Sequence, residues 1–261
     1  MKKKLSIIIM VIFITAVSFA GSGRTQLLRD GLGLSGVDGK IVAGENDRWF
    51  FKLDSDLSDD KGFVKAETLI EMMPSSALET VVADPGQKLH AGFRIWGRVT
   101  RYESRNYIFA IYFLPIVEVK KSVTSRSRRE EKAEIVNDPN DALTVPAELV
   151  EKLSTRRIIK TEDLKKGLQL KQDSILADRT GFITERNGQP FFVIDGMGRN
   201  IPKVSIRLLP CYFLEIAEKK QNDSLEQQRF KVAGIVTRYK DENYLLLQRA
   251  RRVYSHGNFP K

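Results

Sequence analysis

The chain contains the same residue pattern twice. Residues 93–107 read FRIWGRVTRYESRNY, and residues 230–244 read FKVAGIVTRYKDENY. A phenylalanine, a glycine, the run Val-Thr-Arg-Tyr and a closing Asn-Tyr fall in the same register in both copies. A repeat of this quality indicates that one structural unit occurs twice, because each copy must form the same local structure. The sequence therefore predicts two related small domains.

The repeat extends upstream of this pattern through three further blocks in the same order. Gly39 corresponds to Gly181, and the paired phenylalanines at positions 50–51 correspond to those at 191–192. A proline at 74 or 210 is followed in each copy by Leu-Glu four residues later. Four blocks in one order, with small gaps, indicate an internal duplication.

Each copy is predicted to be mainly β-structure. In the second copy, residues 181–185 and 190–194 flank Asn187-Gly188, a dipeptide typical of a type I′ hairpin turn. Residues 206–216 are apolar but contain Pro210, which favours an edge strand, a bulge or the start of a short helix. Residues 230–239 and 244–253 form a second hairpin around residues 240–243.

This order of elements resembles an OB-fold barrel, and each copy has a suitable length of roughly 80 residues. The segment FKVAGIVT at 230–237 resembles the x-Val-x-Gly-x-Val strand common in OB-fold domains. Gly97 and Gly234 stand in mid-strand, where a small barrel needs a bulge or a sharp bend. We expect a mainly β chain with two duplicated small OB-fold-like β-barrels joined by a charged linker and short helices. Another small barrel, such as an SH3-like one, is the alternative.

The first residues are typical of an export signal. Lys2, Lys3 and Lys4 precede an apolar run from Leu5 to Phe19, and the small residue Ala20 follows. We interpret residues 1–20 as a signal peptide cleaved before Gly21, with an uncleaved membrane anchor as the alternative. The resemblance is therefore to an exported bacterial-type protein, periplasmic or extracellular, whose mature chain has no integral membrane span. Removal of the three lysines lowers the formal charge from +10 to +7.

The composition divides the remaining chain into four parts. These are a first barrel repeat at 27–118, a flexible charged linker at 119–144, a short helical segment at 145–169 and a second barrel repeat at 170–256. The linker is too poor in apolar residues to bury enough surface to fold alone. Apolar residues at helical spacing over 149–153, and Thr161 as an N-cap, predict two short helices in the helical segment.

No enzymatic, metal or cofactor site is assembled in the sequence. Cys211 is the only cysteine and lies among apolar residues, so we expect a small buried side chain. His90 and His256 are too few for a Cys/His metal site or a catalytic triad. The G-x-G-x-x-G string at 31–36 lacks the flanking strand and helix of a dinucleotide site. The acidic residues at 54–60 lack the glycine and glutamate of an EF-hand and are interpreted as a hairpin loop.

The repeated Val-Thr-Arg-Tyr motif has two interpretations. In the structural one, its valines face the core, Arg101 and Arg238 form ion pairs, and the asparagines at 106 and 243 shape the hairpin turns. The glutamates at 79 and 215 then pair with a repeat-related arginine. In the functional one, basic and aromatic side chains on the strand faces stack bases or sugars. The candidate ligand-binding residues are Trp96, Arg98, Arg101, Tyr102, Arg238, Tyr239, Arg249, Arg251 and Arg252.

Two functions follow from these patterns. The first is an exported, non-catalytic binding or structural protein of the cell envelope, with an envelope protein or a polyanionic polymer as partner. The alternative is an OB-type binder of single-stranded nucleic acid or anionic oligosaccharide. The strand from Ile108 to Ile116 is apolar on both faces. It is expected to pack outside its own barrel, against the rest of the chain or, by self-association, against a second copy.

Overall fold

The computed structural model describes residues 27–83, 92–116, 156–165, 168, 173–195 and 204–254. The predicted signal peptide, the predicted linker and the predicted helix near 149–153 lie outside these residues. Within the described ranges, no helix has both the length and the apolar character that a bilayer crossing requires.

The first repeat folds into a closed five-stranded barrel. Its strands are β1 (Gly33–Ala43), β2 (Trp49–Leu53), β5 (Leu69–Met72), β7 (Arg105–Ile116) and β6 (Gly92–Tyr102), in that spatial order. β5 and β7 are parallel, and the other neighbours are antiparallel. The helix α1 (Ser76–Ala83) lies between β5 and β6 in the sequence, and the short strands β3 (Leu57–Ser58) and β4 (Phe63–Val64) form a side hairpin.

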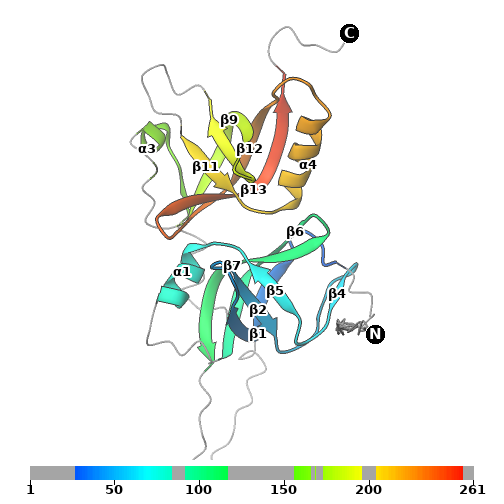
Figure 1. Ribbon diagram of the computed structural model, residues 1–261. Coiled ribbons are helices and arrows are strands. Elements are labelled where there is room, and N and C mark those ends of the chain that lie inside the picture. The colour runs from blue at the N-terminus through cyan, green and yellow to red at the C-terminus, as the bar shows by residue number, and fades with distance from the viewer. Residues whose placement is uncertain are drawn as a thin grey trace, which may run out of the picture.

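The second repeat has the same topology. Its strands are β9 (Ser174–Arg186), β10 (Gln189–Ile194), β11 (Ser205–Leu208), β13 (Glu242–Val253) and β12 (Arg229–Tyr239). β9 pairs with both β10 and β12, which closes the ring, and α4 (Tyr212–Asn222) lies between β11 and β12 in the sequence. The prediction of two duplicated OB-fold-like barrels is confirmed (Figure 1).

The same positions form the core of both barrels. Phe51 and Phe192 are fully buried, as are Phe93 and Phe230, which open the repeated pattern. The valines of the two Val-Thr-Arg-Tyr motifs are also fully buried, as predicted. Burial of one such side chain contributes roughly 1.5–3 kcal/mol relative to exposure. The duplication therefore preserves the residues that each barrel needs for its own stability.

The hairpin turns confirm one prediction and correct another. Asn187-Gly188 has positive φ at both residues (52° and 70°), as a type I′ turn requires. The turns of the β6–β7 and β12–β13 hairpins are Glu103-Ser104 and Lys240-Asp241, with φ between 47° and 64°. The asparagines Asn106 and Asn243 therefore do not shape these turns, and that prediction is wrong.

These asparagines instead hold the segment that leads into each barrel. Asn106 accepts a hydrogen bond from the backbone N–H of Leu28 (3.0 Å) and donates one to the carbonyl of Leu28 (3.1 Å). Asn243 donates to the carbonyl of Leu168 over 2.8 Å. A side-chain amide has both a donor and an acceptor, so it can pair with a backbone segment as a neighbouring strand would.

The segment before the second barrel differs in detail from the prediction. A two-residue strand, β8 (Arg157–Ile158), pairs in parallel with β9, and α3 (Thr161–Lys165) follows. Thr161 is the first helical residue and not the N-cap. The capping contact comes from Asp163, which accepts a hydrogen bond from the backbone N–H of Lys160 over 3.0 Å. A carboxylate in the first turn thus satisfies a backbone donor at the start of the helix.

Two further expectations concern apolar residues. Cys211 is 1% exposed, so its predicted burial is confirmed, and burial raises the pKa of its thiol to about 12. The main neighbours of β7 are β5, β6 and α1, all in its own module. These contacts account for the apolar character of the strand, and Leu114 remains 38% exposed. Self-association through β7 stays a prediction.

The glycines at the two predicted bulges give a direct test of the barrel geometry. The β6–β7 register shifts between Trp96 and Gly97, and the β12–β13 register shifts between Ala233 and Gly234. A Cβ atom at Gly97 would clash with the carbonyl oxygen of Phe109, and one at Gly234 with that of Leu246. We expect Gly97→Ala and Gly234→Ala each to lower the free energy of unfolding by about 1–3 kcal/mol in urea titrations.

The control is Gly33→Ala in β1, because a Cβ there meets nothing within 4 Å. Equal urea midpoints for Gly33→Ala and the two bulge variants would show that the bulges do not need glycine.

Candidate functional site

The repeated Val-Thr-Arg-Tyr motif lies at the junction between the two barrels. In both copies its threonine forms a hydrogen bond with the backbone of the opposite barrel. Thr100 on β6 donates a hydrogen bond over 3.0 Å to the carbonyl of Pro210, just before α4. Thr237 on β12 accepts one over 2.9 Å from the backbone N–H of Ser76, the first residue of α1. Both threonines are nearly fully buried (2% and 0% exposed). Because buried hydroxyls need partners, these bonds tie each hairpin to the helix start of the other barrel.

One glutamate on each helix, at corresponding positions of the repeat, makes a further hydrogen bond between the barrels. Glu79 of α1 accepts a hydrogen bond from the backbone N–H of Lys240 over 2.9 Å, and Glu215 of α4 accepts one from Glu103 over 3.2 Å. The prediction that these glutamates pair with repeat-related arginines is therefore wrong. The first residue of a two-residue turn lies outside the strand ladder, so its N–H needs a partner elsewhere.

The motif tyrosines also cross the junction. Tyr102 donates from its hydroxyl to Glu218 of α4 over 2.8 Å. Tyr239 accepts a hydrogen bond from the indole nitrogen of Trp49 over 3.1 Å. Both candidate ligand-binding tyrosines therefore make contacts between the barrels.

The motif arginines differ between the copies. Arg238 forms the expected ion pair, with Asp241 of its own hairpin, over 2.5 Å. The guanidinium of Arg101 instead lies 5.2 Å from the ring centre of Tyr212, the first residue of α4. Such cation–π contacts contribute about 0.5–1 kcal/mol at exposed sites.

The two halves of the junction carry different charges. Lys240 forms an ion pair with Asp47 over 2.8 Å, whereas its counterpart Glu103 faces Glu215 and Glu218. Burial raises the pKa of Glu218, and the neighbouring carboxylates of Glu103, Glu185 and Glu215 add to the shift, although the tyrosine hydroxyl bound to it opposes it. Folding therefore favours protonated Glu218. Its stabilising contribution is present below the ordinary carboxyl pKa and is lost as the pH rises through the raised pKa.

A basic cleft of about 420 Å³ opens beside this junction. Its charged side chains are Arg29, Lys61, Arg98, Arg101 and one carboxylate, Asp30. Asp30 accepts hydrogen bonds from the backbone N–H groups of Arg101 (2.9 Å) and Tyr212 (3.4 Å). Within the part of the chain that the structure describes, the side chains of Arg29, Lys61 and Arg98 form no hydrogen bond or ion pair. The cleft therefore presents a positive surface.

A single carboxylate, that of Asp59, forms hydrogen bonds with the backbone of both loops that carry Arg29 and Lys61. Asp59 accepts hydrogen bonds from the backbone N–H groups of Arg29 (2.6 Å), Lys61 (2.7 Å) and Gly62 (2.5 Å). The bond from Arg29 is the main reason that the pKa of Asp59 lies below its ordinary value. The acidic stretch at 54–60 therefore serves as a structured hairpin loop beside the cleft.

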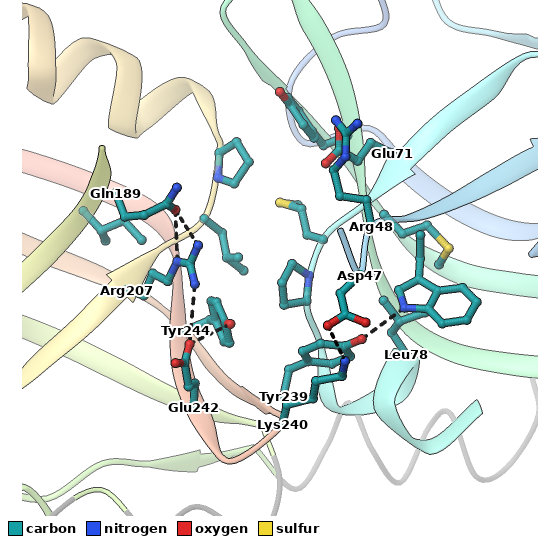
Figure 2. A pocket seen from close by; sticks show the side chains of 18 of the residues that line it. Asp47, Arg48, Glu71, Leu78, Gln189, Arg207, Tyr239, Lys240, Glu242 and Tyr244 are labelled. Atoms are coloured by element: carbon teal, nitrogen blue, oxygen red, sulfur yellow. Dashed lines mark hydrogen bonds and ion pairs between the residues drawn. The ribbon is translucent and has the colours of Figure 1, made fainter. Parts of the chain in front are cut away.

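A second cleft of about 570 Å³ lies at the same junction (Figure 2). Its aromatic lining residues are Trp49, Tyr107, Tyr239 and Tyr244, and its apolar lining includes Met73, Pro74, Leu209 and Pro210. Its charged lining residues are three acids and three bases: Asp47, Glu71, Glu242, Arg48, Arg207 and Lys240. The hydrogen bond from Thr100 to Pro210 lies between the clefts, since Thr100 lines the basic cleft and Pro210 the charge-balanced one.

The remaining candidate residues lie away from both clefts. Trp96 packs against Tyr112, with ring centres 5.7 Å apart. The three β13 arginines follow Gln248, which lines the basic cleft: Arg249, Arg251 and Arg252. Arg249 forms an ion pair with Asp178. The nine candidates thus do not form one groove. Arg98 and Arg101 line the basic cleft, and Tyr239 lines the charge-balanced one.

Sequence reasoning missed Arg29, Lys61 and the role of the threonines. Arg29 and Lys61 come from loops that are distant in sequence, and no periodicity marks them. The role of the threonines could have been predicted from the sequence. A hydroxyl at the same position of two largely apolar strands indicates a buried hydrogen-bond partner. Among the described residues, no three histidine, cysteine, aspartate or glutamate side chains gather as a metal site.

Comparisons with known proteins add little to this description. No protein-family model matches the chain, and no curated protein matches it. A structure of the tetrameric p202 HIN2 matches with 9% identity over 88% of this chain and 95% of that chain, with a TM-score of 0.25. A deletion mutant of the Thermus aquaticus single-stranded DNA binding protein matches with 9% identity over 88% and 98%, with a TM-score of 0.21. A murine DNA binding protein bound with double-stranded DNA matches with 10% identity over 87% and 97%, with a TM-score of 0.20. Similarities of this size carry no argument about this chain.

The unequal charges at the junction predict a stabilising substitution. Glu103→Lys gives the first copy the charge that Lys240 has in the second, and places it against Glu215 and Glu218. We expect the free energy of unfolding to rise by about 0.5–1 kcal/mol near neutral pH, as measured in urea. The gain should shrink at acidic pH, because protonation of the two glutamates removes the attraction.

The control is Glu226→Lys, the same change of charge at an exposed site away from the junction. An equal gain in both variants would show that net charge, and not this contact, changes the stability.

Proposed function

We propose that this chain is a non-catalytic binder of an anionic polymer, single-stranded nucleic acid in the first instance, and that the basic cleft is its binding site. The charge of the cleft carries the proposal. Four cationic side chains line it, and its one carboxylate, Asp30, already accepts two backbone hydrogen bonds. Among the described residues, Lys61 and Arg98 have no hydrogen-bond or ion-pair partner, so their charges are available for phosphate groups, whose neutralisation releases counterions and drives such binding.

An aromatic ring beside the cations supports the same proposal. Tyr212 lines the cleft and is 37% exposed, and the guanidinium of Arg101 lies over its ring. Bases stack on aromatic rings and on guanidinium planes with little dependence on sequence, at about 1–3 kcal/mol per base. The cleft thus combines contacts for the backbone of the polymer with a surface for its bases.

The last strand of the second barrel supplies a path for a longer polymer. β13 continues from Gln248, at the cleft, to three arginines in the next four residues. Arg249 is paired with Asp178, whereas Arg251 and Arg252 are exposed. We propose that these two side chains contact the polymer beyond the cleft.

We further propose that the protein acts outside the cytoplasm. This rests on the sequence of residues 1–20, where a basic start, an apolar run and small residues are typical of a signal peptide. An exported binder of this kind meets extracellular nucleic acid or anionic glycans of the cell envelope.

The proposal is tested by fluorescence anisotropy with a labelled single-stranded oligonucleotide of about 15 nucleotides. We expect Lys61→Gln with Arg98→Gln to weaken binding at low salt. The double variant should also reduce the slope of log K against log salt by about 1.4, because each contact with a single strand contributes about 0.7. Lys61 is exposed and Arg98 half-exposed, and neither has a hydrogen-bond or ion-pair partner among the described residues, so the fold should persist.

The matched control is Lys219→Gln with Lys220→Gln, which removes two exposed cations from the last turn of α4, away from both clefts. A sulfated oligosaccharide serves as competitor and identifies an anionic glycan as the preferred polymer if it binds more tightly. Absence of binding to either polymer at low salt, or an equal loss in the control variant, would contradict the proposal.

A further inference from the structure

We propose that the basic cleft selects guanine in a single-stranded nucleic acid, and that the carboxylate of Asp30 makes the selection. This inference rests on the proposed function and adds a base preference to it. Asp30 is the one carboxylate among the residues that line the cleft, against four cationic side chains. A negative charge at this place weakens the attraction of the cations for phosphate, so it requires a reason of its own.

The backbone contacts of Asp30 use only one of its two oxygens. Its Oδ1 accepts hydrogen bonds from the backbone N–H groups of Arg101 (2.9 Å) and Tyr212 (3.4 Å). Among the residues that the structure describes, none donates to Oδ2, and no lysine or arginine forms an ion pair with the carboxylate. The side chain is half-buried, and an ionised carboxylate has about four acceptor positions. Oδ2 can therefore accept a hydrogen bond from a ligand.

Asp30 lies beside the surface on which a base is proposed to stack. The two backbone groups that it binds belong to Arg101 and Tyr212, and the guanidinium of Arg101 lies 5.2 Å from the ring centre of Tyr212. The tyrosine is 37% exposed, so a base can approach this pair. A base stacked there lies close to Asp30, while Lys61 and Arg98 remain available for phosphate groups.

A carboxylate only accepts hydrogen bonds, and this ranks the four bases. Guanine presents two adjacent donors on its Watson–Crick edge, the N1–H and the 2-amino group. Adenine and cytosine each present one amino group beside a ring-nitrogen acceptor. Thymine presents one N–H between two carbonyl oxygens, which repel a carboxylate. Because unpaired bases can be recognised on this edge, Asp30 favours guanine most and thymine least.

The preference is tested by fluorescence anisotropy with four single strands of about 15 nucleotides. One is all thymine, and in the others every third base is guanine, adenine or inosine. We expect the guanine strand to bind about tenfold more tightly than the all-thymine strand, because a hydrogen bond to a charged group contributes at least this much. Inosine lacks the 2-amino group, so it should lose part of this gain. Adenine stacks as a purine but offers one donor, so it should bind more weakly than guanine.

The variant Asp30→Asn assigns the preference to the carboxylate. Asparagine keeps one oxygen for the two backbone N–H groups but has an amino group, a donor, in place of Oδ2. We expect the variant to bind the all-thymine strand more tightly than the wild type does, and to lose the preference for guanine. The matched control is Arg98→Gln, which should weaken binding of all four strands by the same factor. Circular dichroism and urea midpoints verify that both variants are folded.

Equal binding of the guanine and all-thymine strands by the wild type would overturn the base preference and leave the proposed function intact. Equal binding of the guanine and adenine strands would assign the preference to purine stacking and overturn the role of Asp30. A guanine preference that persists in Asp30→Asn would overturn that role as well. Lack of binding to all four strands would contradict the proposed function, and the base preference with it.

Discussion

Two buried threonine hydroxyls hold the barrels together, and the other features of the junction depend on them. Thr100 and Thr237 occupy the same position of the repeat, and each bonds to the backbone at the helix start of the opposite barrel. Leaving a buried hydrogen-bonding group without a partner costs about 1–3 kcal/mol. The barrels must therefore meet in one register. That register also brings a glutamate of each helix to the hairpin turn of the other barrel.

The junction explains why function is proposed where the copies differ. OB-fold proteins bind ligands with loops between their strands. In this chain, the β6–β7 and β12–β13 hairpins, which carry the Val-Thr-Arg-Tyr motif, each contact the opposite barrel instead. The cationic Arg98 corresponds by register to the apolar Ile235 in the second copy, so this charge of the basic cleft is not repeated in the second barrel. Glu71 and Arg207 likewise occupy equivalent positions with opposite charges. Divergence after duplication has given one cleft a positive surface and the other a balanced one.

Much of the fold could be predicted from the sequence, because the signals were local. The Asn187-Gly188 turn, the bulges at Gly97 and Gly234 and the burial of the repeated phenylalanines follow from residue type and spacing. The sites could not be predicted in the same way. Arg29, Lys61 and Arg98 come together only through tertiary structure, and the partners of Glu79 and Glu215 lie in the other barrel. A repeat in one chain shows which residues correspond, but not how the two copies face each other.

The junction is tested most directly by calorimetric unfolding of the double variant Thr100→Val, Thr237→Val. Valine keeps the shape of threonine but removes the hydroxyl, so both reciprocal hydrogen bonds are lost, together with the bond that Thr237 donates to Asp173 (2.7 Å), while each barrel keeps its own apolar core. We expect the wild-type chain to unfold in one cooperative transition, and the double variant to unfold in two, one for each barrel. A single transition at an unchanged temperature in the double variant would contradict the role of the two threonines.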